Sequence, residues 1–120
     1  MKTTILWTLA LTLCAADMAM ASDGQSGKAS WYGRGHIGRK TASGEIFTGK
    51  GRTAAHKDLP LGSVVRVKDT ATGRSVVVRI NDRGPYVAGR IIDLSEDAAR
   101  ALGIRDRGIA DVTLESLALR

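Results

Sequence analysis

The run Val76-Val77-Val78-Arg79-Ile80-Asn81-Asp82-Arg83-Gly84-Pro85 joins an apolar strand pattern to a polar turn. Side chains along a β-strand alternate between two faces, so Val76, Val78 and Ile80 share one face, and Asp82 returns to it if the strand continues. A carboxylate at the rim of a buried face is well placed to act as a general acid. Asp, Asn, Gly and Pro together are also the residues that a tight turn selects. Two interpretations, a catalytic acid and a structural turn, are therefore open on this segment alone.

The chain from Lys28 onward consists of short β-rich segments separated by glycine. Strands are expected over residues 28–32, 64–68, 75–80, 90–94 and 110–115. The polar stretch 69–74 between two of them is typical of a hairpin connection. Several short strands of this kind indicate one compact, mainly β domain, which is either a barrel or a sandwich.

One short helix is expected after residues 90–94. Ser95 is a suitable N-cap, two acids follow it at the positive end of the helix, and Gly103 can end the helix after Leu102. Ala98, Ala101 and Leu102 have helical spacing and are expected to face the core. So short a helix needs tertiary packing to persist.

The N-terminal residues have the pattern of a secretory signal peptide. Lys2 precedes an apolar stretch that runs to about Leu13, and Ala19-Met20-Ala21 offers a cleavage site with small residues on both sides. We expect a signal peptide over 1–21, a polar lead-in over 22–27 and the domain over 28–118. The protein is then exported, and it is either periplasmic or secreted.

Cys14 is the only cysteine, and it lies in the expected signal peptide. One alternative is that the protein is a lipoprotein anchored through Cys14, because residues 11–14 loosely resemble a lipoprotein box. If cleavage follows Ala21, the exported protein has no disulfide, no cysteine nucleophile and no cysteine-based metal site. With only His36 and His56 left, no structural metal site is expected.

The formal net charge is +6. Inside a cell such a charge would suggest a nucleic-acid partner, but an exported protein meets the cell wall and anionic membrane surfaces instead. We therefore expect no nucleic-acid partner, and at most a weak association with a membrane surface. Solubility and weak retention at an acidic envelope account for the charge.

Aromatic and hydroxyl side chains form two polar clusters before the middle of the chain. Sugar rings bind on aromatic faces, whereas Trp and Tyr also anchor small cores, so both roles are open for Trp31 and Tyr32. The segment Thr41-Ala42-Ser43-Gly44-Glu45 adds two hydroxyls and a carboxylate. Glu45 either contacts a substrate or a neighbouring acid, or is an exposed turn residue.

The remaining candidates are a histidine and the surroundings of two aspartates. His56 lies near small residues, where its imidazole can relay a proton, orient a carboxylate or bond to backbone. Asp82 has Asn81 and Arg83 beside it, and Arg83 is a structural or substrate partner. Asp93 precedes the helix and is expected to bond to backbone donors at the helix entrance.

Several familiar catalytic motifs are absent from the sequence. There is no Gly-x-Ser-x-Gly elbow, no phosphate-binding loop and no His-Glu-x-x-His pair. The usable groups are carboxylates and one histidine, which suit glycosidic bond cleavage, where a carboxylic acid protonates the leaving oxygen. No cofactor is expected.

Together the motifs resemble the rare lipoprotein A family of bacterial envelope proteins over about residues 27–117. They are, in order, Ala29-Ser30-Trp31-Tyr32-Gly33, Thr41-Ala42-Ser43-Gly44-Glu45, Thr53-Ala54-Ala55-His56, Leu59-Pro60-Leu61-Gly62, Asn81-Asp82-Arg83-Gly84-Pro85 and Arg90-Ile91-Ile92-Asp93-Leu94-Ser95. The resemblance implies a six-stranded double-psi β-barrel with one short helix, related to barwin, expansins and family-45 endoglucanases. It also implies an endolytic lytic transglycosylase that cuts between N-acetylmuramic acid (MurNAc) and N-acetylglucosamine (GlcNAc), in glycan strands without stem peptides, leaving 1,6-anhydro-MurNAc ends.

The resemblance assigns catalytic roles to Asp82, His56 and Glu45 by position. Asp82 would protonate the glycosidic oxygen and then help deprotonate the attacking hydroxyl, while His56 and Glu45 would set its protonation and hold substrate. The candidate substrate contacts are Trp31, Tyr32, Thr41, Ser43, Asn81, Arg83 and Asp93. The expected partner is a peptidoglycan glycan strand, the expected state is a monomer, and no sporulation-related repeat domain is expected.

Two rival functions need no catalytic acid. One is a non-catalytic, expansin-like module that binds cell-wall glycan through the barrel and its aromatic residues. The other is an envelope interaction protein whose basic surface meets a protein partner.

Overall fold

The computed structural model describes residues 24–117 of the 120-residue chain. The expected signal peptide, the alternative anchor at Cys14 and the expected last residue of the domain, Ala118, lie outside the described residues.

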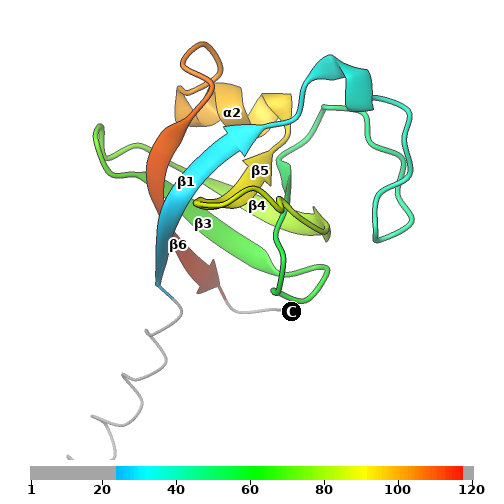
Figure 1. Cartoon of the computed structure of the whole chain (residues 1–120), viewed down its shortest axis with the longest axis horizontal. Coiled ribbons are helices and arrows are strands. Elements are labelled where there is room, and N and C mark those ends of the chain that lie inside the picture. Colours follow the sequence, from blue (N-terminus) through cyan, green and yellow to red (C-terminus); the bar gives the residue numbers. More distant parts are fainter. Residues whose placement is uncertain (1–23, 118–120) are drawn as a thin grey trace, which may run out of the picture.

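Six strands close into a barrel in the order β1-β5-β2-β4-β3-β6 (Figure 1). The elements along the chain are β1 (Gln25–Trp31), the 3-10 helix η2 (Arg34–His36), β2 (Thr53–Ala55), β3 (Val64–Asp69), β4 (Ser75–Asp82), β5 (Arg90–Leu94), α2 (Glu96–Leu102) and β6 (Ala110–Leu117). The pairs β1/β5 and β2/β4 are parallel, and the other four are antiparallel. The mainly β prediction is confirmed, and the closed sheet decides for the barrel over the sandwich.

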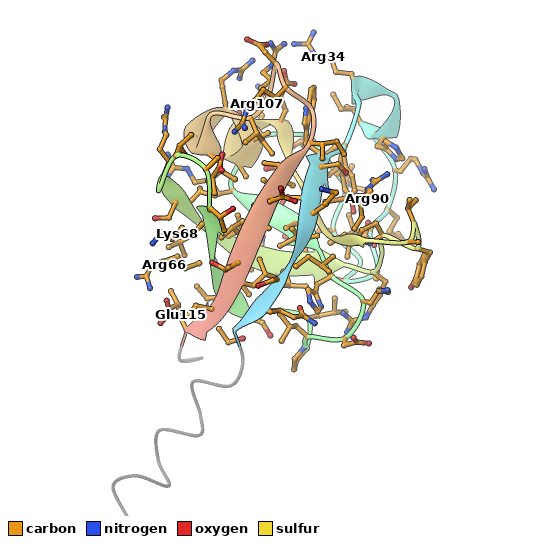
Figure 2. All side chains as sticks on the ribbon, turned by 60° about the vertical axis from the view of Figure 1, so that its left-hand side comes forward. Arg34, Arg66, Lys68, Arg90, Arg107 and Glu115 are labelled. Carbon is orange, nitrogen blue, oxygen red and sulfur yellow. The ribbon has the colours of Figure 1, made fainter. Side chains whose placement is uncertain are left out.

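Alternating side chains along the strands fill the barrel interior. On β4, Val76, Val78 and Ile80 are buried, as the sequence pattern predicts, and the residues between them face outward. The outer face of β3 carries cations, because Arg66 and Lys68 project away from the barrel (Figure 2). Arg66 lies opposite Glu115 of β6, and the two form an ion pair of 2.7 Å.

Helix α2 has the start and the end that the sequence predicts. The Ser95 hydroxyl accepts a hydrogen bond from the Ala98 N–H, and Gly103 ends the helix with a left-handed φ of 87°. Ala98 and Leu102 are buried as expected, while Ala101 is only partly buried against the core. Ala99 is also buried, which the predicted spacing omitted.

Several strand bounds differ from the sequence-based expectation: β1 covers 25–31 and not 28–32, and β3, β4 and β6 each extend one or two residues beyond their expected ends. The polar lead-in was expected to run to Gly27, but β1 begins at Gln25, because residues 25–27 pair with β6. A Cβ on Gly27 would lie 2.6 Å from the Ile91 side chain, so glycine is required there by close packing. β2 was not expected, because its three residues show no alternation of their own and form a strand by pairing with β4 and β5.

The connections after β1 and after β4 both contribute residues to the site, and the one after β1 is the longer. The chain between β1 and β2 makes a long excursion that extends to one side of the barrel (Figure 1). It contains η2 and a turn held by hydrogen bonds between Arg39 and Phe47 and between Thr41 and Glu45. Among the described residues, no helix combines the length and the apolar character needed to cross a bilayer.

Replacing Ser95 with alanine should destabilise the barrel by about 2 kcal/mol. Ser95 is fully buried, and its Oγ accepts from the backbone of Ala98 and Thr53 and donates to the Gly51 carbonyl. The measurement is urea unfolding followed by circular dichroism. The matched control is Ser75→Ala at an exposed strand position, which should change stability by less than about 0.5 kcal/mol. Equal losses in the two variants would contradict the role given to Ser95.

Candidate active site

A cleft of about 280 Å³ opens beside the end of β4. Its walls come from three parts of the chain: the excursion after β1 between Tyr32 and Phe47, the segment 82–86, and Asp93 of β5. The barrel thus brings together residues that are far apart in the sequence. Asp82 lies at the point where these segments meet.

An extra residue in β4 aims Asp82 into the cleft. Ala54 of β2 pairs with Ile80, and Ala55 pairs with Asp82, so Asn81 has no partner of its own on β2. Asn81 is buried next to buried Ile80, and the strict alternation therefore ends one residue before Asp82. A bulge of this kind redirects the side chains that follow it. The predicted rim position of Asp82 is confirmed, but a bulge rather than strand parity produces it.

Three donors hold the Asp82 carboxylate. Oδ1 accepts from the backbone N–H groups of Ala42 and Arg83, both at 2.9 Å. Oδ2 accepts from the Tyr32 hydroxyl at 2.8 Å. Oδ1 is thus occupied by two N–H donors that can only donate, whereas Oδ2 meets a hydroxyl that can donate or accept. Oδ2 is consequently the oxygen that can carry a proton without losing a partner.

Tyr32 is fixed in place by aromatic neighbours. Its ring stacks on His36 with centroids 5.1 Å apart and meets Phe47 edge-on at 4.7 Å. Burial, and then the hydrogen bond to Asp82, raise the pKa of the Tyr32 hydroxyl well above its usual range. Tyr32 therefore stays protonated near neutral pH and serves Asp82 as a hydroxyl partner.

Asp93 forms a second acidic position in the cleft. Its Oδ1 accepts from the Ser30 hydroxyl on β1 and from Arg90 at 2.7 Å; Figure 2 shows Arg90 beside β1. The expectation that Asp93 bonds to backbone donors at the helix entrance is wrong, because Ser95 caps the helix. The parallel register instead places Asp93 opposite Ser30.

The His56 imidazole is outside the cleft lining. It is 3% exposed, its Nδ1 accepts from the backbone of Asp58 and Leu59, and its Nε2 lies 2.8 Å from Gln25 Oε1. This pattern assigns the proton to Nε2, and burial lowers the pKa of His56. His56 nevertheless adjoins the acid through its backbone, because its N–H donates to the Asp82 carbonyl at 3.1 Å.

Glu45 is also outside the cleft lining and is held by an arginine. Arg79 donates to both carboxylate oxygens at 2.8 and 2.9 Å, and the Ser43 hydroxyl donates at 3.0 Å. The hydrogen bonds from Arg79 lower the pKa of Glu45 to about 2. The Glu45 side chain is 44% exposed, and its turn contains Ala42, one of the donors to Asp82.

Of the expected substrate contacts, Tyr32, Thr41, Arg83 and Asp93 line the cleft. Arg83 is anchored by its Nη1, which donates to the carbonyls of His56 and Leu59 at 3.0 and 2.7 Å. Both interpretations of Arg83, as a structural and as a substrate partner, are compatible with this position.

The other three expected contacts, Trp31, Ser43 and Asn81, lie outside the cleft lining. Trp31 packs against the core, and its Nε1 donates to the Arg105 carbonyl at 3.0 Å, which is the core alternative for this residue. The Ser43 N–H donates to the Asn81 carbonyl at 3.1 Å, so both residues attach the turn after β1 to β4.

Five lining residues were not singled out in the sequence: His36, Arg39, Lys40, Phe47 and Tyr86. Tyr86 had a visible signal, because it is an aromatic residue that directly follows the Gly84-Pro85 turn, and it is 76% exposed. The others carry no local signal, since only the folded turn brings them to Asp82. No group of three or more His, Cys, Asp or Glu that could hold a metal ion occurs within residues 24–117.

Comparisons with known proteins agree with this architecture. The family model described as "Lytic transglycolase" matches residues 24–114. The chain is 55% identical over 91 residues to "Probable endolytic peptidoglycan transglycosylase RlpA" of Synechocystis sp., covering 76% of this chain and 28% of that protein. It is 52% identical over 93 residues to "Endolytic peptidoglycan transglycosylase RlpA" of Neisseria meningitidis, covering 78% of this chain and 39% of that protein.

A solved structure shares the fold. The expansin of Clavibacter michiganensis superposes with a TM-score of 0.61 at 23% identity, over 79% of this chain and 50% of that one. The fold is therefore the double-psi β-barrel that the resemblance implied. Because the family model matches residues 24–114 and the aligned 91 residues are 55% identical to the Synechocystis protein, the chain belongs to the lytic transglycolase family, in its rare lipoprotein A group.

Proposed function

We propose that this barrel is an endolytic peptidoglycan lytic transglycosylase domain. The observation that carries the proposal is the Asp82 carboxylate in the cleft, with Oδ1 held by two backbone donors and Oδ2 beside the Tyr32 hydroxyl. Membership of the family and the names of its relatives supply the substrate class. The proposed substrate is a glycan strand without stem peptides, and the proposed location is outside the cytoplasm, in the cell envelope.

A single acid is sufficient for this reaction. Protonated Asp82 gives its proton to the GlcNAc O4 as the bond from that oxygen to the MurNAc C1 breaks. The C6 hydroxyl of the same MurNAc then forms a bond to C1, and its proton passes to the Asp82 carboxylate. The products are a GlcNAc end and a 1,6-anhydro-MurNAc end, Asp82 is protonated again, and no water is consumed.

The Tyr32 hydroxyl can stay hydrogen-bonded to Asp82 Oδ2 in both protonation states of the acid. It donates to Oδ2 while Asp82 is ionised, and it can turn to accept when Oδ2 carries the proton. Because its pKa is raised, Tyr32 keeps its own proton, and Asp82 remains the group that gives a proton to the substrate.

His56 and Glu45 support Asp82 without entering the cleft, and we assign them positioning roles. The His56 imidazole ties the 58–59 backbone into a turn whose carbonyls hold Arg83, the residue that follows Asp82. Glu45 ties its turn to β4 through Arg79, which keeps the Ala42 N–H on Asp82. Both residues thus preserve the geometry of the acid.

Asp82→Asn should abolish lytic activity, with a loss of at least about a hundredfold, because the amide cannot deliver a proton. In the assay, the purified barrel domain is incubated with amidase-treated peptidoglycan, and anhydro-muramyl products are detected by mass spectrometry. Asp106→Asn is the control, since Asp106 is 95% exposed and outside the cleft. Undiminished product from Asp82→Asn would overturn the assignment. Binding to glycan with no product from the unaltered protein would favour the expansin-like module.

Tyr32→Phe should keep the aromatic packing and slow the reaction about tenfold, as for the loss of one hydrogen bond to a charged group. The initial rate of product formation measures this effect. Near-ultraviolet circular dichroism checks that the ring environment persists. A variant that retains its near-ultraviolet spectrum and the full rate would show that the hydroxyl has no part in the reaction.

Glu45→Gln should lower stability in a pH-dependent way. The pKa of Glu45 is about 2 in the folded protein and about 4.3 when unfolded, so ionised Glu45 stabilises the fold above pH 4.3, and this contribution is lost as the pH falls toward 2. The expected difference at pH 6 is about 0.5 kcal/mol, as for exposed ion pairs. Urea unfolding of both proteins at pH 6 and pH 3 measures it. A difference that grows on acidification would contradict the pairing.

A further inference from the structure

The cleft carries more positive than negative charge. Its lining contains three cations, Arg39, Lys40 and Arg83, and two carboxylates, Asp82 and Asp93. Asp93 is already paired with Arg90, from outside the lining, and Asp82 is held by a hydroxyl and two backbone N–H groups. Within residues 24–117, no carboxylate lies within ion-pair distance of Arg39 or Lys40.

The backbone holds these two cations at defined places on the rim. The Arg39 N–H donates to the His36 carbonyl at 3.2 Å, and its carbonyl accepts from Phe47 at 2.8 Å. Lys40 forms a β-bridge with Ile46. Both side chains are exposed, so water and ligand can reach them.

The Arg39 guanidinium lies near the catalytic end of the cleft. Its Nη1 is 3.1 Å from His36 Nδ1, and the His36 ring stacks on Tyr32, whose hydroxyl meets Asp82. The positive charge of Arg39 also lowers the pKa of the Tyr32 hydroxyl, against the larger effects of burial and Asp82 that raise it. Nη1 is the only guanidinium nitrogen of Arg39 with a side-chain partner in the described chain, so Nε and Nη2 remain for a ligand.

The substrate proposed above offers a matching anion. Each MurNAc carries a lactyl ether on its ring, and the lactyl carboxyl is either an amide, where a stem peptide is attached, or a free carboxylate. A guanidinium presents paired N–H donors that fit a carboxylate, and a neighbouring ammonium adds charge. An amide at the same place has lost the negative charge that these cations attract.

We propose that Arg39 and Lys40 form a carboxylate subsite that binds the free lactyl carboxylate of MurNAc. This inference rests on the proposed function and adds a selection rule: the cleft recognises the charge of the lactyl group, and does not merely exclude the bulk of a stem peptide. A glycan without peptides but with neutralised lactyl groups is then a poor substrate.

The test compares two peptide-free glycans with the same protein. One has free lactyl carboxylates, and on the other these are capped as methylamides, a change that removes the charge and adds little bulk. For the unaltered barrel, kcat/KM should fall about tenfold to a hundredfold on capping, mainly through KM. For the double variant Arg39→Gln, Lys40→Gln, the ratio between the two glycans should fall to about one.

A matched control removes two cations elsewhere. Lys50→Gln, Lys68→Gln makes the same change in net charge at exposed positions outside the cleft lining, and its ratio should equal that of the unaltered protein. Figure 2 shows Lys68 on the outer face of β3. A control variant that loses discrimination as fully as the cleft variant would show that general attraction, and not the subsite, selects the glycan.

Binding provides a readout without turnover. The Asp82→Asn variant should bind the glycan with free lactyl carboxylates at concentrations where it does not bind the capped glycan. Adding Arg39→Gln and Lys40→Gln to this variant should remove the difference in binding. Equal cleavage or equal binding of the two glycans by proteins with intact Arg39 and Lys40 would overturn the subsite and leave the proposed activity standing. Absence of anhydro products from both glycans, with selective binding intact, would overturn the activity and leave the subsite standing.

Discussion

The parallel pairing of β2 with β4 is the constraint on which the site depends. β2 has only three residues, yet it lies between β4 and β5 and completes the closed sheet. Its register admits one extra residue, Asn81, and this bulge turns Asp82 from the barrel wall into the cleft. The pairing continues beyond the strand, where His56 N–H meets the Asp82 carbonyl. The strand pairing that closes the barrel therefore also places Asp82 in the cleft.

The Asp82 carboxylate is held by two chemically different kinds of hydrogen-bond donor. Backbone N–H groups from Ala42 and Arg83 occupy one carboxylate oxygen, and a tyrosine hydroxyl that both donates and accepts occupies the other. This asymmetry distinguishes the two oxygens before any substrate is bound. Glu45 and His56 act one step further away, since each stabilises a turn that carries a contact to Asp82 or to Arg83. In the proposed reaction, preorganisation of this kind would remove the cost of arranging polar groups around the acid.

Among the described residues, positive side chains are paired with carboxylates at some places on the barrel and are unpaired at the cleft. Many of the arginines are neutralised locally: Arg66 by Glu115 across two strands, Arg79 by Glu45, and Arg107 by fully buried Asp69. The two exposed pairs, Arg66–Glu115 and Arg79–Glu45, contribute little to stability, and all three pairs leave little net charge at their positions. At the cleft, Arg39 and Lys40 have no such partner among the residues that the structure describes. The formal charge of +6 is a property of the whole chain. The attraction of the cleft for an anion depends instead on which cations near it are unpaired.

Local patterns in the sequence were sufficient for much of the fold. Alternation predicted the buried face of β4, β5 was predicted with its exact bounds, and Ser95 and Gly103 marked the ends of α2. The ordered motifs indicated the double-psi barrel, which is confirmed, and pointed to Asp82, which lines the cleft. These features are local because strand alternation and helix capping act over a few residues.

Only the tertiary structure decided the rest. β2 and the first residues of β1 are strands because distant strands pair with them. Tertiary contacts likewise placed Trp31 against the core, turned the His56 ring toward backbone, and brought Arg39 and Lys40 into the same cleft as Asp82. The physical reason is that hydrogen bonds across strands and the charges around a cleft join residues that are remote in the sequence, so no local pattern specifies them.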